Sequence, residues 1–396
     1  MSNKNKTINK SHGVGPVFAA ACIGMCFFGI SMITLGSVLP ELAERFALSD
    51  DERTGLTTSL PGGILLGSLL FGPVVDRYGH KLLLILSCVL VLAGVVGLAW
   101  APSTAWLPVA IVAIGLGGGV LNGETNALVT ELYDGARRAS RLSLLGMFYG
   151  AGALTIPVLL DRLHAFFTFQ TILTGFALLM LVGVIFCLTV SFPAPKQPQG
   201  FPLREVRRII ASPALLLLSL VLFFQSGVES ITNNWTTTYT FAEGFSESEG
   251  LGALTAMLIG LTAARLLQVW LFSRVAPTTV MVLSLLLTLC AFEGMAMASS
   301  PIGLYASMAL AGAGLASTFP VVFGILGSTF ANLSGTAFSI ALVVALCGQM
   351  ALNTLAGSMA VASMPHIAAA AVGLMLLLYV LWQATGLARL ASTEKI

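Results

Sequence analysis

Residues 72–100 read GPVVDRYGHKLLLILSCVLVLAGVVGLAW, a short charged turn followed by an uninterrupted apolar run. The run from Leu82 to Trp100 contains no charged residue and is close to the roughly 20 residues that a helix needs to cross a bilayer core. The same pattern recurs along the whole chain of 396 residues, of which 57% are hydrophobic and only 9% charged. Soluble domains carry roughly 25% charged residues. The sequence therefore predicts an all-α membrane protein.

Apolar runs of similar length predict twelve membrane spans, most of them joined by short connections. The predicted spans are 16–39, 55–76, 82–101, 106–131, 141–160, 170–192, 214–240, 250–272, 278–299, 302–330, 335–361 and 366–388. With the amino terminus inside, fifteen of the 19 basic residues lie on the inner side and three on the outer side. Lys and Arg accumulate in cytoplasmic loops. We therefore expect a multi-pass protein of the plasma (inner) membrane with both termini cytoplasmic.

The longest internal connection divides the spans into two groups of six. It is rich in proline and in basic residues, and it predicts an N-terminal bundle at 1–192, a cytoplasmic linker at 193–213 and a C-terminal bundle at 214–396. Within the linker, Leu203–Ile210 has the pattern of a short amphipathic helix that lies on the anionic inner leaflet. A plain solvated linker is an equally good interpretation.

The turn between the second and third spans resembles the signature loop of the major facilitator superfamily. In GPVVDRYGHK, Gly72 is followed after three residues by Asp76 and Arg77, and then by Gly79 and two final positions that are basic in that family. Gly79 permits a tight turn, and His80 stands where the family has Arg or Lys. The resemblance implies the major facilitator fold, with two pseudo-symmetric six-helix bundles that alternate access to a central site. It also implies that Asp76 meets the start of the eleventh helix when the cytoplasmic side is closed.

Three further stretches resemble the fucose–proton symporter branch of this superfamily, namely Asn126–Pro157, Phe223–Tyr239 and Gly314–Leu326. The resemblance implies proton-coupled symport of a monosaccharide. Two departures stand against it: Asn122 occupies the place of the branch's acid on helix four, and Gly29–Pro40 contains no acid. A proton-driven drug or metabolite exporter is the nearest rival, although helix five lacks the Gly-Pro pair usual in drug exporters.

The fourth span carries polar residues on two opposite faces. At roughly 100° per residue, Asn122 and Asn126 share one face, and Glu124 and Glu131 share the other. Side-chain amides offer donors and acceptors to a sugar hydroxyl, but buried Asn also joins helices to each other. Both interpretations of the Asn pair stand.

The seventh span carries a continuous polar stripe that includes a carboxylate. Glu229 lies about 16 Å from the outer end of the span, so it is the expected proton-coupling residue. A carboxyl group there can donate a hydrogen bond to a solute when protonated and is unfavourable when ionised in a closed, dry site. Trp235 offers a flat apolar face to a sugar ring, with packing as the alternative role. The expected substrate-binding residues are Asn122, Asn126, Gln225, Asn233, Asn234, Trp235, Gln349 and Asn353.

Arg265 is a charged residue inside the eighth span, about 13 Å from the predicted cytoplasmic surface, and Glu124 lies at a similar depth of about 10 Å. A buried Arg is more tolerable beside a carboxylate. We therefore predict an ion pair between them, with Glu124 as a displaced proton carrier being the alternative. The expected ion-pair and gate residues are Arg265, Asp76, Arg77, Glu131 and Arg141.

These patterns predict a secondary active transporter that moves a monosaccharide-like solute with protons. A Na⁺-coupled sugar carrier and the exporter remain as alternatives. The four histidines lie at span ends or in tails, and the sequence has no phosphate-binding Gly-Lys-Ser/Thr loop. We therefore expect no enzyme activity, no cofactor, no metal and no nucleic-acid partner, and a monomer in the bilayer.

Overall fold

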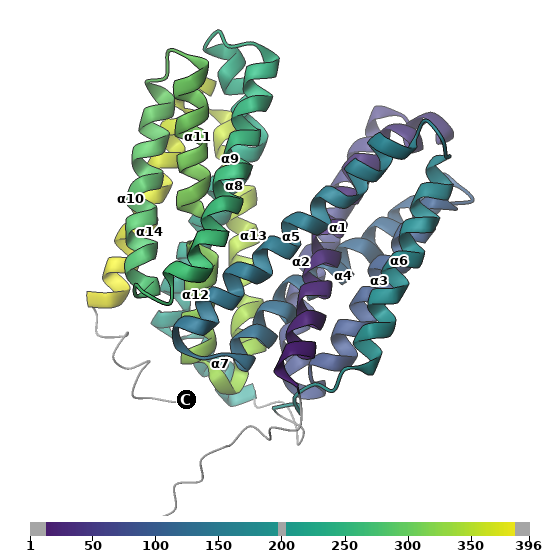
Figure 1. The fold of residues 1–396 in the computed structure, drawn as a ribbon, viewed down its shortest axis with the longest axis horizontal. Helices are drawn as coiled ribbons and strands as arrows, with labels where there is room; N and C mark the ends of the chain where they lie inside the picture. The colour runs from purple at the N-terminus through teal and green to yellow at the C-terminus, as the bar shows by residue number, and fades with distance from the viewer. Residues whose placement is uncertain (1–12, 197–202, 385–396) are drawn as a thin grey trace, which may run out of the picture. The chain divides into compact units, whose positions relative to one another are not determined.

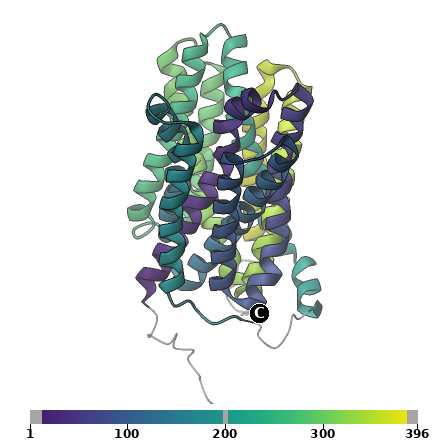
Figure 2. The ribbon, with the colours of Figure 1, turned by 90° about the vertical axis from the view of Figure 1, so that its right-hand side faces the viewer.

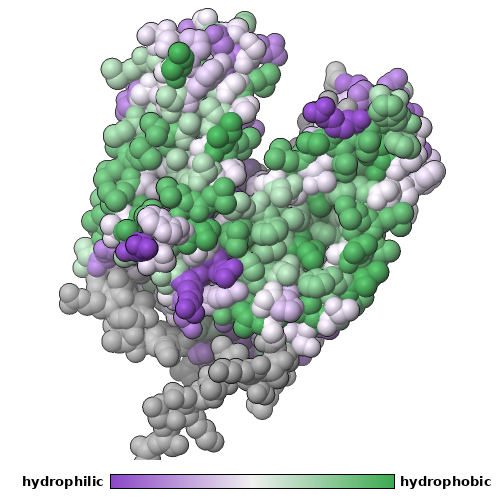
Figure 3. Space-filling view, viewed as in Figure 1, coloured by the Kyte–Doolittle hydropathy of each residue, from purple (hydrophilic) through white to green (hydrophobic). Residues whose placement is uncertain are grey.

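The computed structural model describes residues 13–196 and 203–384 as a helical protein. Within these residues, twelve helical segments are long and apolar enough to cross a membrane, which confirms the predicted number of spans. Figure 3 shows hydrophobic residues spread over the flanks of these helices. The basic residues Lys4, Lys6, Lys10, Arg389 and Lys395, the linker segment 197–202 and the end of the twelfth predicted span lie outside the described residues.

The chain forms two compact units whose helices run lengthwise beside one another within each unit (Figures 1 and 2). Unit 1 comprises Met1–Leu132 and Ala151–Phe201, and unit 2 comprises Tyr133–Gly150 and Pro202–Ile396. The fifth helix is therefore shared, since its first half packs with unit 2. The predicted bundles 1–192 and 214–396 follow chain order and remain a prediction.

Unit 1 is built around α4, which packs against α1, α2 and α3. The helices that contribute to unit 1 are α1 (Val14–Phe46), α2 (Asp50–Tyr78), α3 (His80–Ala99), η1 (Thr104–Trp106), α4 (Leu107–Leu132), the second half of α5 (Gly135–Leu163) and α6 (Phe169–Thr189). Small residues allow the close approach of α2 and α4: a Cβ atom at Gly67 would collide with the carbonyl oxygen of Leu116.

The turn between α2 and α3 depends on Gly79. Its φ of 84° is in the region that favours glycine, which confirms the tight turn predicted from the signature loop. Because α3 begins at the next residue, the turn places His80 at the first helical position, where it is buried.

Unit 2 is built around α8, which packs against α9, α13 and α14. Its helices are the first half of α5, α7 (Leu203–Ile210), α8 (Pro213–Ala242), α9 (Glu247–Leu271), α10 (Pro277–Ala296), α11 (Pro301–Leu315), α12 (Thr318–Thr329), η2 (Ala331–Leu333), α13 (Ser334–Ser358), η3 (Val361–Ser363) and α14 (Met364–Ala384). The short linker helix expected at Leu203–Ile210 is confirmed as α7.

The tenth span is not the single helix that its apolar run suggests. It is interrupted at Ala316 and Ser317, between α11 and α12. Pro320 has no backbone N–H, so the carbonyl group of Ala316 loses its donor in the helix. The carbonyl oxygen of the preceding residue, Leu315, accepts a hydrogen bond from Gln225 of α8. The break therefore presents the end of α11 to α8.

Candidate functional site

Gln225 and Glu229 lie one turn apart on α8 and contact each other. The Nε2 atom of Gln225 donates to Oε1 of Glu229 at 2.8 Å and to the carbonyl oxygen of Leu315 at 3.1 Å. Gln225 is fully buried, and Glu229 is partly buried. A single amide group therefore fixes both the carboxyl group and the broken end of α11.

Arg265 of α9 and Tyr149 of α5 lie close enough to Glu229 to interact with it electrostatically, and both belong to unit 2. The Nη1 atom of Arg265 donates to the carbonyl oxygen of Gly146 at 2.7 Å. Its Nε atom is buried without a hydrogen-bond partner among the described residues. A carboxyl group and a guanidinium group thus share one site inside the membrane-spanning part of unit 2.

A second polar cluster joins α8 to α13. The Oδ1 atom of Asn353 accepts hydrogen bonds from Nδ2 of Asn234 and from Nε1 of Trp235, both at 3.0 Å. Gln349 lies one turn before Asn353 on α13, and Asn233 is exposed on α8. The structure therefore brings three of the predicted substrate-binding residues together. Asn234 lies five residues after Glu229, or about 8 Å along α8.

The two asparagines of α4 bond to each other. Nδ2 of Asn126 donates to the backbone oxygen of Asn122 at 2.7 Å and lies 3.4 Å from its side-chain oxygen. They belong to unit 1, whereas the clusters on α8 belong to unit 2. Their expected role in binding a hydroxylated solute stays a prediction.

Glu124 is paired with a histidine of its own unit. The Nδ1 atom of His80 lies 3.0 Å from Oε1 of Glu124, and the carboxylate is fully buried. The other ring nitrogen lies 3.1 Å from Oε2 of Glu131, whose Oε1 lies 2.6 Å from Nζ of Lys196. Glu124 and Arg265 thus each have partners inside their own unit, and the ion pair predicted between them stays a prediction.

The other expected gate residues lie near helix ends. Asp76 is buried at the end of α2, and the Arg77 guanidinium lies 5.2 Å from the ring centre of Tyr78. Arg141 lies 5.3 Å from the ring centre of Tyr133. The role of Asp76 as a latch stays a prediction.

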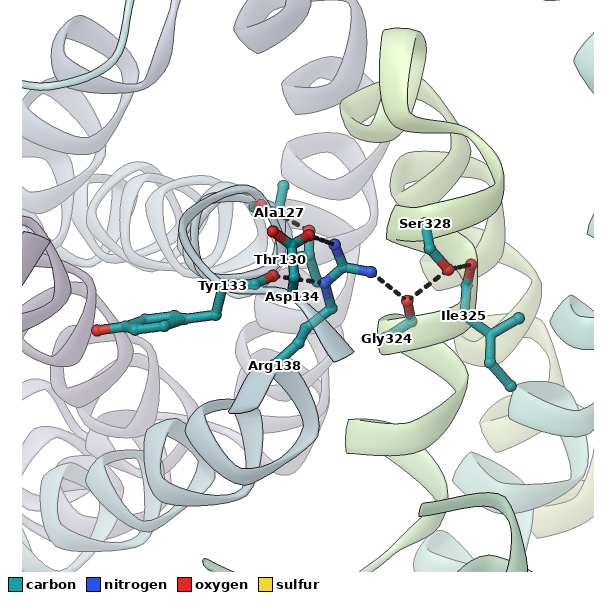
Figure 4. Close-up of polar contacts among 8 residues, drawn as sticks. All are labelled: Ala127, Thr130, Tyr133, Asp134, Arg138, Gly324, Ile325 and Ser328. Atoms are coloured by element: carbon teal, nitrogen blue, oxygen red, sulfur yellow. Dashed lines mark hydrogen bonds and ion pairs between the residues drawn. The ribbon is translucent and has the colours of Figure 1, made fainter. Parts of the chain in front are cut away.

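Arg138 makes a contact that the sequence did not suggest. Figure 4 shows its guanidinium group between the start of α5 and α12. Nε donates to the carbonyl oxygen of Tyr133 at 2.8 Å, Nη2 to Asp134 at 3.0 Å and Nη1 to the carbonyl oxygen of Gly324 at 3.1 Å. The planar fork of an arginine serves three acceptors at once, so Arg138 holds α12 against α5.

We expect Arg138→Lys to destabilise the protein by about 1–3 kcal/mol, because a lysine has a single nitrogen and leaves part-buried carbonyl groups without donors. Thermal unfolding of the purified protein measures the loss. Asp134→Asn is the matched control: the Asp134 side chain is 95% exposed, and exposed ion pairs contribute little. Equal effects of the two substitutions would show that the contact with Gly324 is unimportant.

His80 and Tyr149 are the other residues that sequence reasoning did not place in a site. A usable signal existed for His80, because Glu124 and Glu131 share one face of α4 and a histidine begins the neighbouring span. The link between Tyr149, Glu229 and Arg265 joins three helices, and no local pattern reveals it.

The fold and these sites define the class of protein: a multi-pass membrane protein of two helical units. A carboxyl group of α8 and a guanidinium group of α9 form one site in its membrane-spanning part. The family model of the Major Facilitator Superfamily matches residues 21–344. The chain therefore belongs to the Major Facilitator Superfamily and is a membrane transporter, not an enzyme.

Two curated relatives cover most of the chain. It is 29% identical to the 3-(3-hydroxy-phenyl)propionate transporter of Escherichia coli over 308 residues, which is 72% of this chain and 75% of that protein. It is 24% identical to the uncharacterized MFS-type transporter YfkL of Bacillus subtilis over 330 residues, which is 80% of this chain and 82% of that protein.

Solved structures share the fold at low sequence identity. The MFS transporter FucP in its outward conformation superposes with a TM-score of 0.79 at 17% identity, over 92% of this chain and 98% of that one. The proton:xylose symporter XylE superposes with a TM-score of 0.77 at 15% identity, over 93% and 95% of the two chains. At these identities the likeness establishes the fold alone.

Proposed function

We propose that the protein is a proton-coupled symporter of a small polyhydroxylated solute, most simply a monosaccharide. The observation that carries the proposal is the arrangement on α8. Gln225 holds the Glu229 carboxyl group beside Arg265, and one to two turns further Asn234 and Trp235 converge on Asn353. Amide groups and an indole ring suit a hydroxylated ring, and the carboxyl group suits a proton.

In this proposal the proton and the solute depend on each other through Glu229. Protonated, Glu229 is neutral and donates a hydrogen bond to a solute hydroxyl. When Glu229 is ionised, it interacts with Arg265 instead. The site then closes without a solute, because the guanidinium group compensates the charge of the carboxylate. Binding of either ligand thereby favours binding of the other. Rocking of the two units then exposes the site to each side in turn.

A second candidate substrate is an organic acid. The Nε atom of Arg265 is buried without a partner among the described residues, and a guanidinium group binds carboxylates well. The relative that is 29% identical carries the name of a 3-(3-hydroxy-phenyl)propionate transporter. On this alternative, protonation of Glu229 frees Arg265 for the carboxylate of the solute.

A thermal-shift screen of the purified protein separates these candidates. A ligand that binds the folded state stabilises it by RT ln(1 + [L]/Kd), which is about 2.7 kcal/mol at one hundred times Kd. We expect stabilisation by one or more monosaccharides, and neither by a hydrophobic cation nor by an aromatic carboxylate. Stabilisation by 3-phenylpropionate alone selects the organic acid, and stabilisation by a hydrophobic cation alone selects the exporter. Dependence of the shift on Na⁺ at constant ionic strength selects the Na⁺-coupled carrier.

A further inference from the structure

Unit 1 contains a chain of titratable groups that the proposed transport mechanism does not use. Glu124 of α4, His80 of α3, Glu131 of α4 and Lys196 follow one another at 3.0, 3.1 and 2.6 Å. Exposure rises along the chain: the side chains of Glu124 and His80 are 0% and 5% exposed, and those of Glu131 and Lys196 are 18% and 23% exposed. This series of four titratable side chains therefore runs from the interior of unit 1 to its surface, next to the linker.

The two contacts of the imidazole ring fix how many protons the cluster holds. A carboxylate oxygen only accepts hydrogen bonds, and a neutral imidazole has one N–H group. Contacts at 3.0 and 3.1 Å on both ring nitrogens therefore require two protons among Glu124, His80 and Glu131. Either the ring is an imidazolium between two carboxylates, or the ring is neutral and one carboxyl group is protonated. Both forms carry the same net charge of −1, which Lys196 balances.

The surroundings of Glu124 offer no other partner for its second oxygen. Oε2 of Glu124 is buried without a hydrogen bond among the described residues. The other titratable groups that interact with Glu124 are Cys88 of α3 and Cys187 of α6, both buried. On the far side of the Gly79 turn, Asp76 of α2 is also buried. In a permanent ion pair this oxygen belongs to a charged carboxylate, whereas in a protonated carboxyl group it is a neutral carbonyl oxygen, which costs less to bury without a partner.

We propose that Glu124, His80 and Glu131 form a proton-binding relay, through which Glu124 exchanges a proton with the linker end of unit 1. In the release direction, the O–H group of Glu124 gives its proton to Nδ1 of a neutral ring. The imidazolium gives the proton on Nε2 to Glu131, which releases it to water beside Lys196. One proton leaves, the ring ends neutral with its proton on Nδ1, and Glu124 ends as a carboxylate. Uptake follows the same steps in reverse.

The relay adds a second proton site to the transporter, separate from Glu229 in unit 2. Its test needs no substrate, so its failure is distinct from failure of the proposed function. The probe is the C=O band of a protonated carboxyl group in pH-difference infrared spectra of the full chain in liposomes. We expect a pH-dependent band that is lost in Glu124→Gln and retained in the matched control Glu229→Gln, which removes the carboxyl group of α8 in unit 2.

Two substitutions of His80 distinguish a relay from a fixed ion pair. His80→Arg keeps a positive charge between both carboxylates but does not release a proton, so the Glu124 band should vanish while the protein stays folded. His80→Gln offers no charge, so Glu124 should stay protonated: its C=O band should disappear from the pH-difference spectrum but remain in the absolute spectrum, whereas in His80→Arg it should be absent from both. Thermal unfolding and size-exclusion chromatography check the fold of each variant. A band that is unaffected by His80→Arg, or a wild-type spectrum without a contribution from Glu124, would overturn the relay and leave a structural cluster.

Discussion

Replacing Glu229 by glutamine is expected to abolish uphill, pH-driven uptake while solute binding and counterflow exchange survive. Glutamine resembles the protonated carboxyl group in shape and still donates a hydrogen bond, but it does not take up or release a proton. A carrier with this substitution is expected to equilibrate the solute across the membrane without concentrating it. Uptake of a labelled solute from the thermal-shift screen into liposomes, with and without an imposed pH gradient, measures both activities. We expect at least a tenfold loss, or about 1.4 kcal/mol in coupling.

The matched control is Glu293→Gln, which makes the same chemical change on α10. Glu293 is 52% exposed and faces His366 at 3.6 Å, so we expect full uphill uptake. If Glu229→Gln still concentrates solute against a gradient, Glu229 is not the coupling residue. If it also loses binding, the carboxylate is a direct ligand, and the proposed link between proton and solute is wrong.

Replacing Arg265 by glutamine is expected to produce the largest loss of stability among the substitutions considered. The guanidinium group compensates the charge of Glu229 and donates to the carbonyl oxygen of Gly146. Removal of one member of a buried charge pair costs on the order of 3 kcal/mol, because the other charge is left without compensation. Thermal unfolding measures this loss, and transport in liposomes should fall with it.

Coupling between Arg265 and Glu229 is tested by combining the two substitutions. Residues that interact electrostatically show non-additive effects, so the double variant Arg265→Gln/Glu229→Gln should regain part of the stability that Arg265→Gln loses. Gly146→Ala is a milder control, because its Cβ atom would lie 3.0 Å from Cζ and Nη1 of Arg265 and would displace the guanidinium group without removing it. Strictly additive losses would mean that Arg265 acts independently of Glu229. Retained stability with selective loss of carboxylate binding would favour the organic-acid substrate.

Hydropathy and local periodicity were sufficient for the number of spans, although not for the break in the tenth. They predicted the twelve spans, and they offered the short helix Leu203–Ile210 as one of two alternatives. The glycine turn before His80 followed from the resemblance of the signature loop. Local periodicity also placed Glu124 and Glu131 on one face of α4, and the single imidazole ring that reaches both residues confirms that placement. The spans and the shared helix face follow from the length of the hydrocarbon core and from 3.6 residues per turn, so they need no knowledge of neighbouring helices.

The partners of the buried polar groups were decided only by tertiary structure. Depth along the membrane normal does not select which helix faces which, and Glu124 meets His80, which precedes it by 44 residues. The same reason applies to Asn353 with Trp235, to Arg138 with Gly324 and to Gln225 with the carbonyl group of Leu315. Helix periodicity sets the direction in which a side chain points, whereas the packing of helices far apart in sequence sets what it meets there.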